Sequence, residues 1–240
     1  MPSGADRRAT RGQDALEPDA LPVLQGAIPR REQVYTLLEE AILDGVIPAG
    51  AHLREDDVAK RLGVSRNPVR EALQGLVHQG FAEHVPGKGV FVRSPSIQEV
   101  EEVFHVRALL ESESARLAAS RISNADLGRL EDVLERGKHA VAAKDVRRLL
   151  ELNEQFHAMI VTVSGNTVMA KMMQTLQRRI RWYFSSVVVL RSADSWDQHA
   201  EIVRALREAD GESAARHMAA HVEQTWRTIQ ERHRSSGASG

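Results

Sequence analysis

Cysteine is absent from the 240-residue sequence, which excludes disulfide bonds, thiolate metal sites and a cysteine nucleophile. No apolar run approaches the roughly 20 residues that a membrane-spanning helix needs. Residues 1–14 lack the apolar core of a secretory signal. From these absences we expect a cytoplasmic protein with no membrane partner.

Neither sign of charge is in excess, because 32 Lys and Arg residues are balanced by 33 Asp and Glu residues and give a formal net charge of −1. A protein that held nucleic acid through its overall charge would be basic, so any DNA contact must come from a local patch. The hydrophobic fraction of 42% is ordinary for a globular chain of one or two domains and is enough to bury a core.

The first part of the chain predicts helices followed by a hairpin. Apolar residues recur at helical spacing, glycines end the helices, and two short β-rich runs flank a Pro-Gly turn. The predicted elements are helices over 31–43, 54–62 and 65–79, the last capped by Ser65, and strands over 81–85 and 90–94.

The rest of the chain is helical almost to its end, and short breaks with capping or turn residues interrupt the pattern. Short connections favour antiparallel neighbours. The predicted helices cover 97–120, 124–143, 146–163, 167–190, 195–208 and 212–233, with the break before the fifth at Ser192, Ala193 and Asp194.

Four parts follow from these patterns. Residues 1–28 are rich in Pro, Gly, Ala, Asp and Arg and predict a flexible tail, whose arginines either contact phosphates or are simply solvated. Residues 29–94 form a DNA-binding domain, 97–233 an all-helical domain, and 234–240 a disordered tail. The fold class is mainly α, with an N-terminal winged helix-turn-helix, a small β-hairpin wing and a C-terminal antiparallel all-α bundle.

A local basic patch supports DNA binding. Four basic residues and no acidic residue lie between Val58 and Arg70. A basic run on a helix is usually a solvated face, but here it coincides with a tight glycine turn, a helix cap and a hairpin. The candidate contacts are Ser65, Arg66, Asn67 and Arg70 at the start of the third helix, and Gly87 and Lys88 in the wing. Lys88 is either a phosphate contact or the free tip of the hairpin.

Histidines in the helical domain predict a metal site. Asn153 and His157 lie four residues apart on one helix face. His199 and His221 each lie eleven residues from the turn at Asp210, so an antiparallel hairpin places them at the same height. Metal sites in helical bundles are built in this way. Each histidine alone is equally consistent with a core or surface residue, and spacing does not exclude His217.

The DNA-binding part resembles the winged helix of GntR-type regulators, which is most specific over VSRNPVREAL at residues 64–73. The resemblance implies a dimer on palindromic double-stranded DNA, with contacts from the third helix and Gly87. Some members carry an arginine at the position of Asp56. Because this residue is acidic here, Arg54 is the expected phosphate contact in its place.

The helical part resembles the FCD effector domain of FadR-type members over about 97–232, through LLELNEQFHAMIVTVSGN (149–166), QHAEIVRAL (198–206) and AARHMAAHV (214–222). The resemblance implies a divalent ion, commonly zinc or nickel, held by Asn153, His157, His199 and His221. An asparagine in place of the usual aspartate leaves the full +2 charge, which favours an anionic effector. Arg107 resembles an effector-carboxylate contact, so a small organic acid is expected at Arg107, Asn153, His199 and His221. Arg107 is alternatively an ordinary salt-bridged residue.

These features favour a regulator, most often a repressor in this family, whose DNA binding is controlled by an effector. One alternative is a metal-dependent hydrolase with a DNA-binding head. That enzyme needs a base beside the metal, as in HExxH, but the sequence here reads NEQFH and Glu154 is expected to point off the ligand face. Another alternative is a regulator whose bundle is purely structural.

Overall fold

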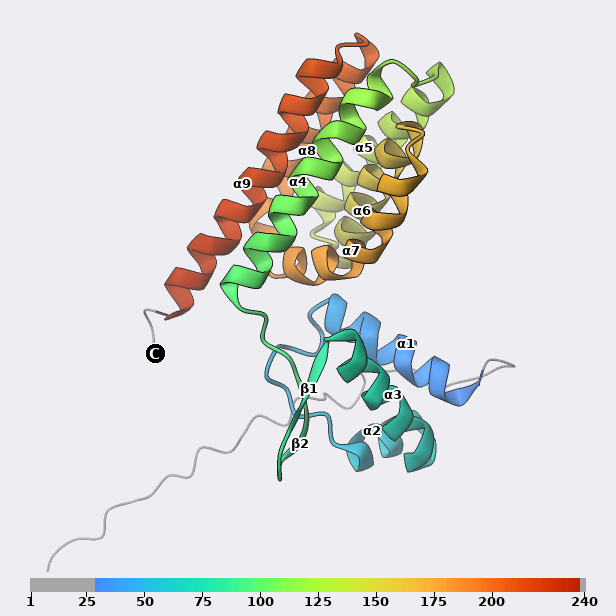
Figure 1. Cartoon of the computed structure of the whole chain (residues 1–240), viewed down its shortest axis with the longest axis vertical. Helices are drawn as coiled ribbons and strands as arrows, with labels where there is room; N and C mark the ends of the chain where they lie inside the picture. The colour runs from blue at the N-terminus through green and yellow to red at the C-terminus, as the bar shows by residue number, and fades with distance from the viewer. Residues whose placement is uncertain (1–28, 238–240) are drawn as a thin grey trace, which may run out of the picture. The chain divides into compact units, whose positions relative to one another are not determined.

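The computed structural model describes residues 29–237 (Figure 1). The expected tail over 1–28 and residues 238–240 lie outside this range. The described chain divides into two compact units, one that ends at Ser94 and one that begins at Pro95, with Leu43–Gly45 grouped with the second. Each unit is described by itself below.

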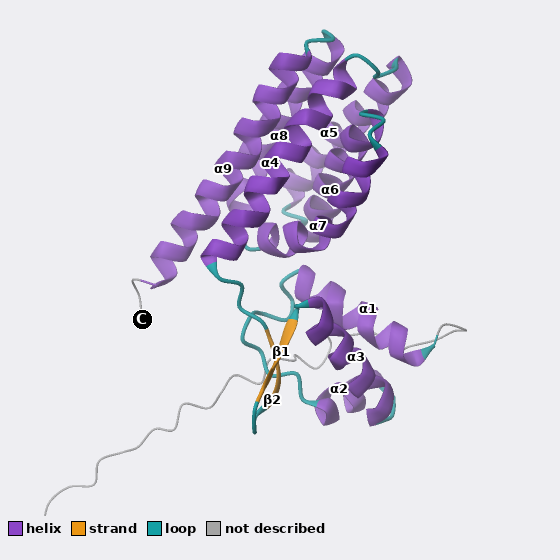
Figure 2. Ribbon diagram, in the orientation of Figure 1, coloured by secondary structure: helices purple, strands orange, loops and turns teal. Residues whose placement is uncertain are grey.

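The first unit contains three helices and a two-stranded antiparallel hairpin (Figure 2). Its core is formed by apolar side chains that the three helices bury, including Leu38, Val58 and Leu73. The elements are α1 (Arg30–Leu43), α2 (Glu55–Leu62), α3 (Arg66–Gln79), β1 (Ala82–Val85) and β2 (Gly89–Val92).

The turn between α2 and α3 depends on Gly63, which has a φ of 64° in the left-handed region and ends α2. Ser65 occupies the N-cap position of α3, but its side chain makes no capping hydrogen bond. The sequence prediction that Ser65 caps this helix is therefore right for the position and wrong for the bond. Its exposed hydroxyl is not used by the helix.

The hairpin pairs Ala82 with Val92 and Val85 with Gly89. A segment that the sequence pattern did not predict as a strand adds to it, because the Leu53 amide donates to the Val90 carbonyl and the Val92 amide donates to the Ala51 carbonyl. These bonds join the wing to the chain that enters α2.

The second unit is an all-helical bundle, in which α4 packs along α9 (Figure 1). Helix α6 is central, because it contacts α4, α5, α7 and α8. It buries Leu152, Phe156 and Ile160 among its neighbours. The helices are α4 (Ile97–Ala119), α5 (Asn124–Ala143), α6 (Val146–Val163), α7 (Thr167–Ser185), α8 (Val188–Arg207) and α9 (Gly211–Gly237).

Two predicted boundaries in the bundle are wrong. Helix α7 ends at Ser185 and α8 begins at Val188, so the break lies before residues 192–194, which are helical. The hydroxyls of Ser185 and Ser186 donate to carbonyls three residues earlier, and such bonds compete with helix continuation. At the other end α9 continues to Gly237 instead of stopping at 233, so residues 234–237 of the expected C-terminal tail are helical.

No helix among the described residues is long and apolar enough to cross a bilayer.

Candidate functional site

Three histidines from three helices meet in the interior of the bundle. His157 on α6, His199 on α8 and His221 on α9 are all buried, and their ligand nitrogens lie within 4.8 Å of one another. The Nε2 atoms of His199 and His221 are 3.3 Å apart. The antiparallel α8–α9 hairpin therefore brings these two residues to one level, as their equal spacing from Asp210 predicts.

Aromatic side chains hold the cluster in place. The His199 ring stacks on Phe156 with a centroid separation of 4.0 Å and meets the edge of Trp196 at 4.9 Å. Trp196 in turn packs on α5 at Gly137, where an added Cβ would lie 2.4 Å from the indole ring. A glycine at this position is thus what admits the indole that supports His199.

The surroundings of the three imidazoles favour their neutral form. Burial lowers the pKa of His157 despite the opposing charge of Glu111. Burial also holds the pKa values of His199 and His221 well below the usual range, and the neighbouring imidazoles and the charges of Arg107 and Arg191 lower them further. Neutral imidazole is the form that binds a metal ion.

Arg107 and Glu111 form a buried ion pair beside the cluster. The Arg107 side chain is 1% exposed, and its Nε donates to Glu111 Oε1 at 3.0 Å. Burial by itself raises the pKa of the Glu111 carboxyl, but the charge of Arg107 and the contacts with Arg107 and His157 outweigh it and lower the pKa to about 2. Glu111 is therefore ionised, and the pair forms one rigid polar unit on α4.

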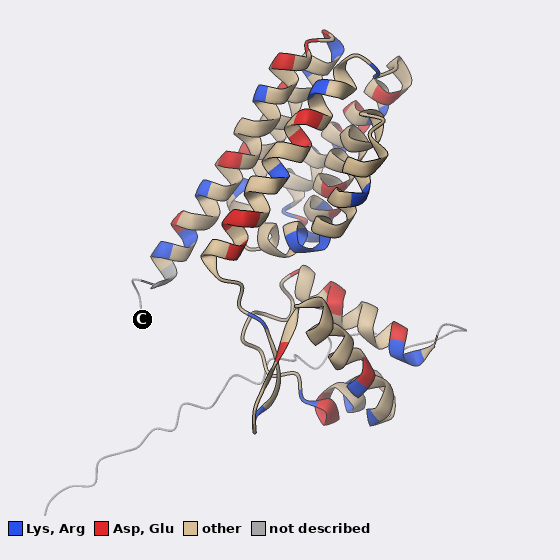
Figure 3. Cartoon of the chain, in the orientation of Figure 1, with Lys and Arg blue, Asp and Glu red and all other residues tan. Residues whose placement is uncertain are grey.

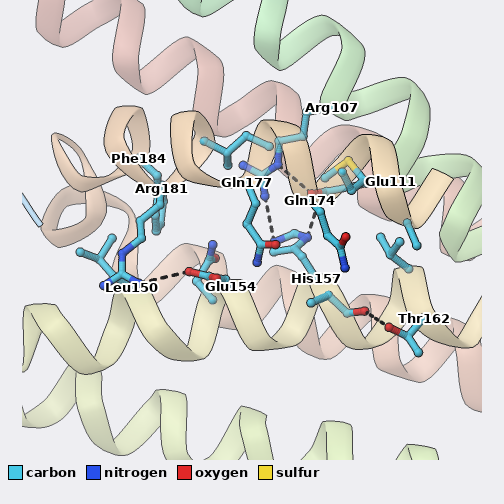
Figure 4. Close-up of a pocket in the computed structure, with 16 residues that line it drawn as sticks. Arg107, Glu111, Leu150, Glu154, His157, Thr162, Gln174, Gln177, Arg181 and Phe184 are labelled. Carbon is cyan, nitrogen blue, oxygen red and sulfur yellow. Dashed lines mark hydrogen bonds and ion pairs between the residues drawn. The ribbon is translucent and has the colours of Figure 1, made fainter. Parts of the chain in front are cut away.

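The ion pair also touches His157. Arg107 Nη2 lies 3.0 Å from His157 Nε2, and because a guanidinium can only donate, Nε2 must accept. The proton of the ring is then on Nδ1, which lies 2.8 Å from Glu111 Oε2 in an arrangement that departs from hydrogen-bond geometry. Figure 4 shows dashed lines joining Arg107 to Glu111 and both residues to His157.

A cavity of about 110 Å³ adjoins this polar unit, between α4, α6 and α7. Arg107, Asn153 and His157 line it, as do the amide side chains of Gln174 and Gln177 on α7 (Figure 4). A water needs roughly 10–15 Å³ of such volume, so the cavity accepts a ligand of about seven to eleven non-hydrogen atoms.

The donor set fits a divalent cation. Three neutral imidazoles whose nitrogens lie within 4.8 Å suit zinc or nickel. The buried Nδ1 of His199 has no hydrogen-bond partner among the described residues. Asn153 is buried one turn before His157 and lines the cavity, in which its amide would be the fourth ligand. Arg107 Nη2 donates a hydrogen bond to the lone pair of His157 Nε2. An ion bound at this nitrogen would need the same lone pair, so the guanidinium would have to turn away.

Other residues from the sequence interpretation lie elsewhere. His217 is only half-buried and is not part of the cluster. Glu154 does line the cavity, which its position off the ligand face did not predict, but Arg181 Nη1 donates to its carboxylate at 3.2 Å. A carboxylate in an ion pair is a poor general base, so Glu154 is poorly suited to that role.

Sequence reasoning missed Glu111 and Gln198. Glu111 lies four residues after Arg107, so the spacing of an Arg and a Glu on one helix face was an available signal. Gln198 precedes His199 and accepts a hydrogen bond from Arg191. No local pattern marks it, because its partner His221 is on another helix.

The predicted DNA contacts lie on the exposed surface of the first unit. Ser65, Arg66, Asn67 and Arg70 are exposed at the start of α3, and Arg54 is exposed at the N-cap of α2. In the wing, Gly87 has a φ of 73° and stands at an exposed tip with Lys88. The positive φ is one that favours glycine, so the turn at the tip depends on this residue.

Acidic side chains of α2 form ion pairs with the two arginines of α3. Arg66 Nε lies 2.5 Å from Asp56 Oδ1, and Arg70 donates from Nε and Nη2 to Glu55 at 3.0 Å. The hydrogen bond from Arg70 lowers the pKa of the Glu55 carboxyl. Figure 3 shows acidic and basic residues side by side on α2 and α3. The patch is therefore less basic in the fold than the run from Val58 to Arg70 suggests.

Comparison with known proteins assigns both units. The family "Bacterial regulatory proteins, gntR family" matches residues 30–92, and the FCD domain family matches residues 102–224. The HTH-type transcriptional repressor RspR of Escherichia coli K12 is 29% identical over 206 residues, which cover 85% of this chain and 90% of that protein. The Nta operon transcriptional regulator of Aminobacter aminovorans is 30% identical over 184 residues, or 76% of this chain and 86% of that protein.

A solved structure agrees with the sequence matches. A transcriptional regulator from Rhodococcus sp. RHA1 assigned to GntR superposes with a TM-score of 0.72 and 26% identity, over 84% of this chain and 98% of that chain. The chain therefore belongs to the GntR family of DNA-binding transcription regulators, with an FCD domain after the winged helix, and not to an enzyme family.

Proposed function

We propose that the protein is a homodimeric transcriptional repressor that binds palindromic DNA. A small organic acid, bound at a divalent metal ion, releases the repressor from the DNA. Residues 29–94 bind the DNA, and residues 97–233 bind the metal and the acid. Because its target is bacterial chromosomal DNA, it works in the cytoplasm. RspR of E. coli, a relative by sequence, is a transcriptional repressor, which supports the sign of regulation.

One observation carries the effector site: His157, one member of the buried cluster of three histidines, lines a 110 Å³ cavity that the buried Arg107 also lines, whereas His199 and His221 are not among the lining residues. Polar groups are buried in this way at a cost, so their convergence on a cavity points to a ligand. His157, His199 and His221 with Asn153 are the ligands of zinc or nickel in this proposal.

The charge of the site selects the effector. Asn153 and the three imidazoles are neutral ligands, so a bound ion keeps its full +2 charge and binds carboxylate oxygens at its open positions. Arg107 lines the same cavity and supplies a second contact to the carboxylate when it leaves His157. The glutamine amides of α7 would contact the rest of the acid.

The DNA site combines the exposed residues of α3, α2 and the wing. Arg66 and Arg70 read bases or phosphates, Ser65, Asn67 and Arg54 contact phosphates, and Gly87 and Lys88 bring the wing to the backbone. Arg66 and Arg70 must first leave Asp56 and Glu55. Exposed ion pairs of this kind contribute only about 0–1 kcal/mol each, so the exchange costs little.

A calorimetric titration with organic acids, run on metal-free and zinc- or nickel-loaded protein, tests the proposal. We expect acids to bind only the metal-loaded form and to weaken operator binding measured in the same buffer. Acid binding that ignores the metal would refute the metal-dependent mechanism, and binding that leaves DNA affinity unchanged would refute effector control.

The contact between Arg107 and His157 favours one alternative, a regulator that works without metal. This contact satisfies the His157 lone pair with a protein donor. Metal analysis of protein purified without chelator separates the two functions. A stoichiometric divalent ion supports the metal site. If no metal copurifies with the protein and none can be added to it, the result supports the metal-free regulator.

A further inference from the structure

We propose that Gln198, held by Arg191, is a positioning residue that fixes His221 in the tautomer whose Nε2 lone pair faces the metal. This inference rests on the proposed metal site and names residues outside its ligand set. It follows from one shared oxygen atom, from the burial of Arg191 and from the position of His221 in the cluster.

The shared oxygen is Gln198 Oε1. It accepts a hydrogen bond from Arg191 Nη2 at 2.6 Å and lies 3.0 Å from His221 Nδ1. An arginine has no acceptor, so the amide atom beside it must be the oxygen rather than the nitrogen. His221 Nδ1 must then donate its proton to the same oxygen.

The consequence appears at the other side of the ring. A neutral imidazole carries one proton, so His221 Nε2 has a free lone pair when Nδ1 is protonated. Nε2 is the atom that faces the cluster, 3.3 Å from His199 Nε2. Histidines that bind a metal commonly donate a hydrogen bond from their other ring nitrogen to an acceptor, which sets the ring orientation. Gln198 is this acceptor for His221.

Arg191 is needed because an amide alone has two orientations. If the Gln198 amide turned over, its NH₂ group would face His221 Nδ1 and favour the opposite tautomer. Arg191 excludes this state, since two donors would then face each other. Its side chain lies on α8, seven residues before Gln198.

Within the described part of the chain, the contacts of Arg191 other than the one with Gln198 do not account for its burial. The residue is 2% exposed, and its Nε has no partner within the described part of the chain. Among the described residues its carboxylate partner is Asp194, which is 3.6 Å away and largely exposed. A guanidinium buried with an unsatisfied donor costs stability, which a role at the site explains.

Among the residues that the structure describes, the other two histidines of the cluster have no equivalent of Gln198. His157 has the same tautomer as His221, but there Arg107 sets it by donating to Nε2. His199 Nδ1 has no hydrogen-bond partner among residues 29–237. With His221 protonated at Nδ1, His199 must donate from Nε2 to His221 Nε2, and no acceptor at Nδ1 prevents it from changing tautomer.

Three variants of the full chain test the proposal. Gln198→Met keeps the length of the side chain and removes the acceptor, whereas Gln198→Glu keeps an acceptor for His221 Nδ1. Gln224→Met is the matched control, because Gln224 lies on α9 three residues after His221 and is exposed. Arg191→Met is a fourth variant, which removes the donor that fixes the Gln198 amide together with the weaker ion pair to Asp194.

The direct measurement is the tautomer of His221 from nitrogen-15 NMR of the metal-free protein. We expect the Nδ1–H form in wild type, Gln198→Glu and Gln224→Met, and the other form or a mixture in Gln198→Met and Arg191→Met. The second measurement is zinc affinity, which we expect to fall about 10- to 100-fold in Gln198→Met, to fall less in Arg191→Met, and to stay near wild type in the other two.

Either of two results overturns the inference: His221 remains Nδ1–H in folded Gln198→Met, or Gln198→Glu loses as much zinc affinity as Gln198→Met. The second result would make the role of Gln198 one of packing. Should Gln198→Met fail to fold, Arg191→Met decides by the same two readouts. If wild type binds neither zinc nor nickel, the proposed function fails, while the tautomer measurement still decides whether Gln198 positions His221.

Discussion

Arg107 has two roles that compete in the proposed mechanism, one toward the metal and one toward the acid. Its guanidinium donates to His157 Nε2 at 3.0 Å, the lone pair that a metal ion would use, and it lines the cavity where an organic acid would bind. Replacement of Arg107 by Met should therefore act on the two ligands in opposite directions. Metal should bind more tightly and the acid more weakly.

The contact gives the size of the effect. A hydrogen bond from a charged donor contributes about 1.5–3 kcal/mol, so its removal should tighten zinc binding about 10- to 100-fold. Loss of a bond of the same kind should weaken acid binding by a similar factor. The buried carboxylate of Glu111 loses its partner in this variant, which typically costs about 3–5 kcal/mol. The metal-free variant should thus melt at a lower temperature and gain more from zinc than wild type does.

Competition against a zinc chelator measures the metal affinity, and calorimetry with a loaded protein measures the acid. Arg136→Met is the matched control, because it removes an arginine from an exposed ion pair on α5. The reasoning is refuted if folded Arg107→Met binds zinc as wild type does or more weakly. It is also refuted if the acid binds both proteins equally.

Further variants test other parts of the structure. Arg66→Ala should weaken operator binding by about 1–3 kcal/mol in fluorescence anisotropy if Arg66 reads a base, and an equal loss on random DNA would make it a phosphate contact. Asp56→Asn frees Arg66 and removes a charge that repels phosphate, so affinity for any DNA should rise about two- to fivefold at low salt; no change would show that the pair does not compete with DNA. His199→Ala should abolish the response of DNA binding to acid and metal while leaving operator affinity unchanged, and a retained response would place the effector elsewhere. Gly137→Ala should lower the free energy of unfolding in urea by up to about 2 kcal/mol, because a clash with the indole costs about 1–3 kcal/mol against a helix-propensity gain of about 1. Gly128→Ala, on the same helix with nothing within 4 Å, should raise it, and equal effects would refute the packing argument.

The sequence predicted the parts of the site that depend on spacing within one helix or across one hairpin. Asn153 and His157 share a face because they lie one turn apart, and His199 meets His221 because both lie equally far from Asp210. Glycine breaks and helical periodicity gave the order of elements for the same reason, since both are local properties. Boundaries that depend on side-chain hydrogen bonds, as at Ser185 and Ser186, were not readable from periodicity.

What the sequence could not predict is how charges pair across helices. The basic run before Arg70 contains no acid, yet the fold brings Glu55 and Asp56 onto it from the preceding helix. Arg107 was placed near an effector but not against a ligand nitrogen, because that contact joins residues 50 positions apart. In both units an arginine of a proposed binding site is held by the protein itself. A ligand that binds such an arginine must first break its existing contact within the protein, which lowers the affinity for the ligand. Ligand binding is thereby coupled to a change in the contacts within the protein. Such a coupling is what a regulator needs, and in the bundle it would run from the metal through His157 and Arg107 to the acid.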